Sequence, residues 1–131
     1  MNYPQWGGLQ AYQKNKYETA SPHRLILMLY EAALVQLDRA ERAIEQRDIA
    51  ERNRTLQKAQ DILVELVSSL NMQQGGEIAR NLRQLYLYMI DRLTQANIKS
   101  DIEAIREVRG LLQPIKSAWE QIGKDVRLES S

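Results

Sequence analysis

Apolar residues recur along this chain at intervals of three and four, and they do not alternate one by one as they would in a half-buried strand. This spacing places the apolar side chains on one face of a helix. Only three prolines, at positions 4, 22 and 114, occur in 131 residues. We therefore predict one all-α domain. The short connections between long helical segments favour an antiparallel, up-down-up-down four-helix bundle.

Start and stop signals divide the pattern into four helices. The first begins at Ser21 and Pro22, an N-cap residue followed by a proline at the first helical position, and runs to about residue 46. The second begins after Asp48, with Glu51 three residues further on as in a capping box. Its apolar seam has a seven-residue repeat, formed by Ile49, Leu56, Leu63 and Leu70.

The third and fourth helices follow a predicted turn at residues 71–76, where two glycines stand together. We expect the third helix at about residues 77–96, with Asn97 as the residue that closes it. Ser100 and Glu103 then form a capping box for the fourth helix. That helix contains Pro114, where we expect a kink, and it frays after about residue 123.

Composition excludes several classes of protein. Lys and Arg number 18 and Asp and Glu number 17, so the net charge of +1 argues against a nucleic-acid binder. No cysteine is present and His23 is the only histidine, so we expect no catalytic site, no metal and no other cofactor. No stretch approaches about 18 consecutive apolar residues, and no signal peptide opens the chain. We therefore expect a cytoplasmic protein that does not insert into membranes and is not an enzyme.

The first helix is apolar on every side. At about 100° per residue, Leu27 and Leu34 lie away from the face that carries Leu29, with Tyr30 beside them. Such a helix needs cover on every side, and we expect three partner helices to supply only part of it. Leu27, Tyr30 and Leu34 are therefore candidate residues for binding a client protein. Leu87 is a further candidate because it stands among charged residues, although single exposed leucines are also normal.

The first 20 residues are rich in aromatic side chains. Four of the eight aromatic residues of the chain lie in this segment, whereas disordered tails are poor in them. Tyr3, Trp6, Leu9 and Tyr12 recur every third residue, which gives a short helix or turn one apolar face. We predict that residues 1–20 are a docking segment, either a displaceable lid or a permanent part of the core. Residues 21–123 then form the bundle, and residues 124–131 form a frayed tail.

Several blocks of the sequence, taken together, resemble a known family. They begin with Thr19-Ala20-Ser21-Pro22 and the apolar run from Leu25 to Tyr30. They continue with Gly75-Gly76-Glu77-Ile78-Ala79, Asn81-Leu82, Leu85-Tyr86, Tyr88-Met89, Arg92-Leu93, Ala96-Asn97, Glu107-Val108, Leu111-Leu112 and Ala118-Trp119. Over about residues 9 to 122, the chain is similar to the flagellin-specific export chaperones of bacterial flagellar assembly. It departs from them at Tyr30-Glu31-Ala32, where the family usually has Tyr-Asp-Gly, and at Pro114.

The resemblance implies a cytosolic four-helix chaperone that binds the C-terminal segment of flagellin. Occupying this segment, which is disordered in the monomer, prevents premature polymerisation and keeps the subunit competent for type III export. The resemblance also implies that Leu9 and Tyr12 contact the client, because they match apolar and aromatic positions of the family's N-terminal pattern. We expect a monomer that binds flagellin one to one, with components of the export apparatus as further candidate partners.

Two other classes of function are alternatives to a chaperone. A helical assembly or regulatory module could use the apolar stripe of the first helix to form a permanent homodimer. A di-iron enzyme of the bundle type needs two Glu-x-x-His motifs, and one histidine cannot supply them.

Overall fold

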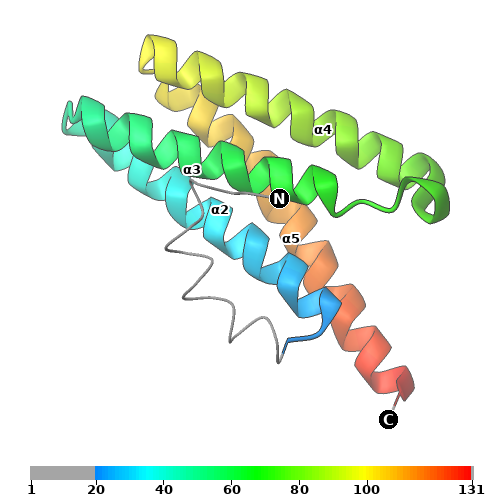
Figure 1. Ribbon diagram of the computed structural model, residues 1–131. Helices are drawn as coiled ribbons and strands as arrows, with labels where there is room; N and C mark the ends of the chain where they lie inside the picture. Colours follow the sequence, from blue (N-terminus) through cyan, green and yellow to red (C-terminus); the bar gives the residue numbers. More distant parts are fainter. Residues whose placement is uncertain (1–19, 131) are drawn as a thin grey trace.

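The computed structural model describes residues 20–130, with side chains for residues 20–123. Within this range it has no strand and four helices: α2 (Pro22–Glu45), α3 (Ile49–Ser68), α4 (Met72–Lys99) and α5 (Ile102–Ser130). They form an antiparallel bundle (Figure 1) in which each helix packs against the next along the chain, and α5 returns to pack against α2. The predicted fold class is confirmed.

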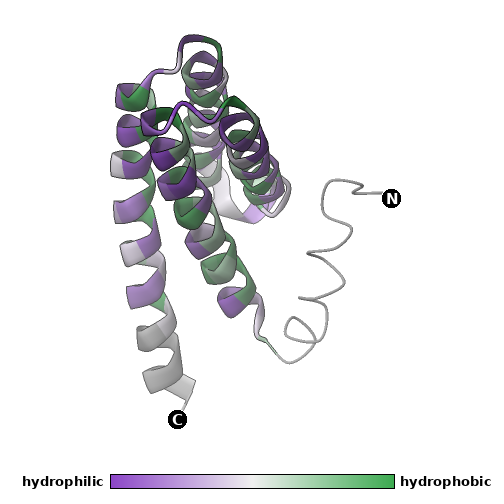
Figure 2. Ribbon diagram, turned by 90° about the vertical axis from the view of Figure 1, so that its left-hand side faces the viewer, coloured by the Kyte–Doolittle hydropathy of each residue, from purple (hydrophilic) through white to green (hydrophobic). Residues whose placement is uncertain are grey.

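The core is one continuous cluster of side chains from all four helices. Its largest fully buried apolar members are Leu37, Leu56, Leu63, Leu66, Tyr86, Met89, Leu93, Ile105, Val108 and Leu112. The predicted seam of α3 is confirmed at Leu56 and Leu63, whereas Ile49, at the first position of the helix, is exposed. Hydrophobic and hydrophilic segments alternate along each helix (Figure 2), as expected of helices with one buried face.

The first two helices begin where the capping residues predict. The Ser21 Oγ accepts a hydrogen bond from the backbone N–H of Arg24 at 3.1 Å. The Asp48 Oδ1 accepts one from the backbone N–H of Glu51 at 3.0 Å. Each bond satisfies one of the amide groups that have no partner within the helix.

The third helix begins earlier and ends later than predicted. Asn71 caps a first turn that starts at Met72, and Gly76 then interrupts the helical backbone with φ 51° and ψ −129°. Glycine fits here because a side chain disfavours positive φ. The helix continues to Lys99, so the predicted closing residue Asn97 lies inside it.

The fourth helix is capped one residue later than predicted. Ser100, in the left-handed conformation with φ 51°, closes α4 and is therefore not the N-cap of α5. Asp101 has that role, because its Oδ1 accepts hydrogen bonds from the backbone N–H groups of Glu103 at 3.0 Å and Ala104 at 3.3 Å. α5 is helical through Pro114 and extends to Ser130, beyond the end expected near residue 123.

Candidate functional site

α2 is apolar on several sides, and the neighbouring helices cover most of its apolar side chains. Tyr30 is buried at 2% exposure and Leu27 at 9%, and Leu34 is half-buried against the core. The side of α2 that carries Leu27 and Leu34 faces α5, since His23 and Glu41 on the same side form hydrogen bonds with that helix. The prediction of an uncovered stripe is therefore wrong at Leu27 and Tyr30, whereas Leu34 keeps partial exposure. Client contacts by these three residues stay predictions. α3 covers one side of α2 and α5 covers the other.

Tyr30 has a structural partner in the centre of the bundle. Its hydroxyl oxygen lies 2.6 Å from that of Tyr86 on α4, so the pair links two helices that are not neighbours in the chain. Burial raises the pKa of the Tyr30 phenol, and the hydrogen bond to Tyr86 partly offsets this rise. Burial and the same hydrogen bond both raise the pKa of Tyr86. The two neutral phenols share one hydrogen bond in the core, in which one hydroxyl donates and the other accepts.

The structure leaves the other three predicted client-binding residues untested. Leu87 is 42% exposed on α4. Leu9 and Tyr12 lie outside the described residues, as does all of the predicted docking segment except Ala20. Client contacts by Leu9, Tyr12 and Leu87 stay predictions.

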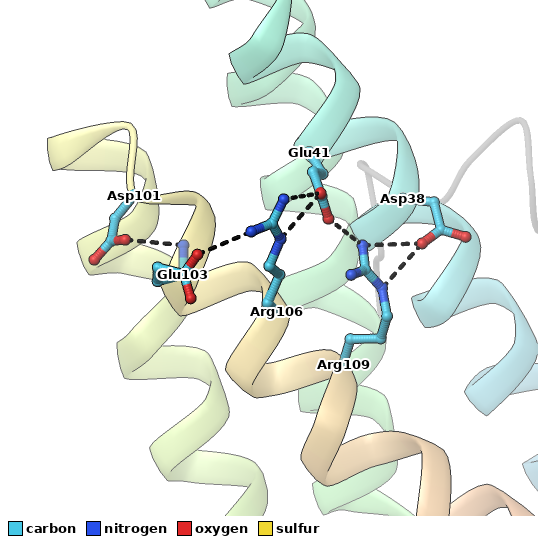
Figure 3. Close-up of polar contacts among 6 residues, drawn as sticks. All are labelled: Asp38, Glu41, Asp101, Glu103, Arg106 and Arg109. Atoms are coloured by element: carbon cyan, nitrogen blue, oxygen red, sulfur yellow. Dashed lines mark hydrogen bonds and ion pairs between the residues drawn. The ribbon is translucent and has the colours of Figure 1, made fainter.

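Charged side chains hold α5 to α2 at the end of the bundle that contains the α2–α3 and α4–α5 connections, which we call the closed end (Figure 3). On α5, Arg109 donates a hydrogen bond to Glu41 of α2 at 2.7 Å, and Arg106 donates one to the same carboxylate at 3.1 Å. Arg109 also donates to Asp38 at 3.0 Å. The hydrogen bond from Arg109, more than any other contact, lowers the pKa of Glu41.

A second set of polar contacts at the closed end holds α4. The Tyr88 hydroxyl and the Arg92 guanidinium both donate to the Glu107 carboxylate of α5, the latter at 2.7 Å. These two hydrogen bonds, that from Tyr88 first, lower the pKa of Glu107. Arg52 of α3 donates to the Asn97 side chain of α4 at 2.9 Å. At this end α5 is therefore fixed to both of its neighbours.

The core stripe of α4 becomes uncovered toward the opposite end, which we call the open end. Met89 is fully buried, Leu85 and Leu82 are half-buried, and Ile78 is 73% exposed. These residues are spaced by three or four, so they share one face of the helix. The face that packs in the core at Met89 is thus in contact with solvent at Ile78.

The stripe of α5 follows the same gradient in the same direction. Val108 is fully buried, Leu111 and Ile115 are half-buried, and Ile122 is 49% exposed. The antiparallel helices α4 and α5 separate toward the open end (Figure 1). We define the open face as the partly covered and exposed members of both stripes: Ile78, Leu82 and Leu85 of α4, and Leu111, Ile115 and Ile122 of α5.

Ile78 and Ile122 continue the apolar repeats of the two helices, so periodicity alone predicts that they lie in the core. Helix length separates Ile122 from the buried members of its stripe. α5 has 29 residues, against 24 in α2 and 20 in α3. At about 1.5 Å per residue, α5 extends beyond the helices that could cover it. Ile78 instead lies just after the break in the helical backbone at Gly76.

The chain matches the family described as flagellar protein FliS over residues 7–126. It is 43% identical over 129 residues to the flagellar secretion chaperone FliS of Salmonella typhimurium, with 95% of this chain and 96% of the relative covered. The Vibrio cholerae chaperone is 42% identical over 120 residues, with 88% of each chain covered. A crystal structure of a bacterial flagellar chaperone has the same fold, with a TM-score of 0.75, 18% identity and coverage of 93% and 99%.

No helix in the described part of the chain combines the length and hydropathy needed to cross a membrane. The family match extends over most of the sequence, and the curated relatives carry the same description. The chain therefore belongs to the FliS family of flagellar secretion chaperones, which are not enzymes.

Proposed function

We propose that this chaperone holds the C-terminal segment of flagellin in the cytoplasm, one chaperone to one flagellin and without a cofactor. Holding this segment prevents subunits from polymerising before export and keeps them competent for the flagellar type III apparatus, whose components are further candidate partners. The descriptions of the relatives specify secretion chaperones. Support for flagellin as the client comes from the sequence blocks that resemble the flagellin-specific chaperones.

The observation that carries the proposal is the open face. Its side chains continue stripes that are fully buried elsewhere in the bundle, so it has the composition of a core with only part of the cover. A client segment that is disordered until it binds loses conformational entropy on binding, and burial of an extended apolar surface offsets this loss. An amphipathic client helix laid along α4 and α5 supplies the cover that the bundle lacks at its open end.

The predicted docking segment has a place in the same proposal. Its apolar residues Tyr3, Trp6, Leu9 and Tyr12 have the composition to compete with a client for the open face. We expect Leu9 and Tyr12 also to contact the client. Tyr12→Ala should then weaken flagellin binding, whereas deletion of residues 1–6 should leave it unchanged or tighten it, because a competitor has been removed. Calorimetric titration of flagellin into each variant and into the unmodified chaperone distinguishes these effects.

The test of the client is a calorimetric titration with monomeric flagellin and with flagellin lacking its last ~50 residues, a length that allows about two helices of the size found here. We expect one-to-one binding to the intact protein and none to the truncated one. Equal binding to both forms would contradict the proposal that the chaperone binds the C-terminal segment of flagellin.

Light scattering tests the alternative of a permanent homodimer. The proposed monomer keeps a concentration-independent mass and forms a one-to-one complex when flagellin is added. A stable dimer that does not dissociate on addition of flagellin would mean that a second copy covers the open face.

A further inference from the structure

We propose that His23, Trp119 and Gly123 form a latch that holds the distal half of α5 against α2 and thereby keeps the open face uncovered. The role of this latch in client binding rests on the proposed function. The latch itself is a property of the free protein.

The latch consists of two hydrogen bonds and a ring contact. The His23 Nε2 donates to the backbone carbonyl of Trp119 at 2.6 Å, and the Trp119 indole N–H donates to the backbone carbonyl of His23 at 2.9 Å. Because a carbonyl oxygen only accepts, the first bond requires the hydrogen on Nε2. The two rings are stacked, with centroids 4.8 Å apart and planes 7° apart. The first turn of α2 is thus joined at two points to a residue 96 positions away.

Gly123 leaves the space that the imidazole occupies. A Cβ at this position would lie 2.1 Å from the His23 Cε1 and within 2.7 Å of both ring nitrogens. At Gly110, the other glycine of α5, a Cβ would have no neighbour within 4 Å outside the local backbone of the helix. A side chain at position 123 therefore displaces the ring, whereas the same side chain at position 110 meets open space.

The position of the latch determines whether α5 packs against α2 or against α4 at the open end. At the closed end α5 is bound to α4 through Glu107 and to α2 through Arg106 and Arg109. At the open end the latch binds α5 to α2, while Ile78 on the opposite stripe of α4 is exposed. Burial of apolar surface is favourable in water, so α4 and α5 are expected to close on each other when α5 is released. The latch opposes that closure.

The first test measures the separation of α4 and α5 in the free, full-length protein. The chain has no cysteine, so spin labels can be attached to single cysteines placed at the exposed positions of Gln84 on α4 and Ser117 on α5. In His23→Ala and Gly123→Ala, we expect the distribution of distances between the labels to shift to shorter values. Gly110→Ala is the matched control, because it makes the same change in the same helix, and it should leave the distribution unchanged.

Thermal melts show whether each variant is folded. If Gly123→Ala does not fold, His23→Ala decides together with Trp119→Phe, which keeps an aromatic ring but loses the indole donor. Distances that are unchanged or longer in the folded latch variants overturn the proposal. An equal shortening in Gly110→Ala also overturns it.

The second test adds a peptide that corresponds to the C-terminal segment of flagellin. If loss of the latch reduces the open population to about a tenth, the apparent Kd of the peptide rises about tenfold. Shorter distances with an unchanged Kd would overturn the role of the latch in binding. If the unmodified chaperone does not bind the peptide, the proposed client is wrong, and the distance measurement still decides whether the latch exists.

Discussion

The two ends of the bundle contain the same kind of apolar repeat but differ in what surrounds it. At the closed end, Leu93 and Ala104 are fully buried, and charged side chains fix α5 to both of its neighbours. At the open end, Ile78 and Ile122 continue the same two stripes and are exposed. The difference lies in the cover and not in the composition of the stripes. An apolar repeat thus specifies which face of a helix packs, but not how far along the helix the packing extends.

Exposure alone does not define the open face. Ile98, near the closed end of α4, is 72% exposed, almost the same as Ile78 at 73%. Ile98 lies on the outer side of the helix, about 160° from the position of Ile78 at 100° per residue, and it does not continue a buried stripe. The two isoleucines form a matched pair within one helix.

The largest expected effect tests the difference in burial between the ends. Leu93→Ala should lower the free energy of unfolding by about 2–5 kcal/mol because it leaves a cavity, and Leu63→Ala, in the seam of α3, should fall in the same range. Ile78→Ala should cost less than about 0.5 kcal/mol, as surface substitutions usually do. Urea unfolding of the three variants measures this. Equal losses at Leu93 and Ile78 would show that the open end is packed as tightly as the closed end.

The next effect concerns the hydrogen bond between Tyr30 and Tyr86. Replacing either residue alone with phenylalanine leaves one buried hydroxyl without its partner, which costs about 1–3 kcal/mol. The double substitution should be nearly neutral, because neither polar group then remains. A double-mutant cycle by chemical denaturation measures the coupling. Additive losses would mean that the two hydroxyls do not depend on each other.

The smallest effect tests the ion pairs of the closed end. Because the pKa of Glu41 is lowered, its carboxylate contributes stability above the ordinary value of 4.5, and this contribution is lost as the pH falls through the lowered pKa. Glu41→Gln should therefore reduce stability at pH 7 by about 1 kcal/mol or less. The difference from the unmodified protein should vanish in strong acid, where Glu41 is protonated. Melts from pH 7 to pH 2 measure it, and a difference that grows on acidification contradicts the assignment.

Much of the fold could be predicted from local signals. Ser21 and Asp48 cap the helices they were expected to cap, and Leu56 and Leu63 are buried, because capping and periodicity depend on nearby residues. The boundary between α4 and α5 was misplaced because Ser100 and Asp101 can both act as caps. The sequence does not show which of them takes the left-handed conformation.

The candidate site was harder to predict because it depends on which helices are neighbours. Leu27 and Tyr30 were expected on the surface, since a count of apolar positions on one helix does not show that α5 returns to cover it. Ile78 continues a repeat that is buried further along α4, so periodicity alone does not show that it is exposed. His23 carries no local signal of a partner, because its contact with Trp119 joins positions 96 residues apart.

The measurement that tests the central claim most directly compares Ile78→Asp with Ile98→Asp for binding to the C-terminal segment of flagellin. Both positions are exposed, so an aspartate at either one stays hydrated in the free protein and both variants should fold. If the client covers the open face, the charge at position 78 is buried on binding, which is unfavourable without a partner. We predict that the Kd of Ile78→Asp rises about tenfold or more, equivalent to at least about 1.4 kcal/mol, whereas that of Ile98→Asp changes less than about twofold. Equal affinities for the two variants, or a loss confined to Ile98→Asp, would contradict the claim that the open face binds the client.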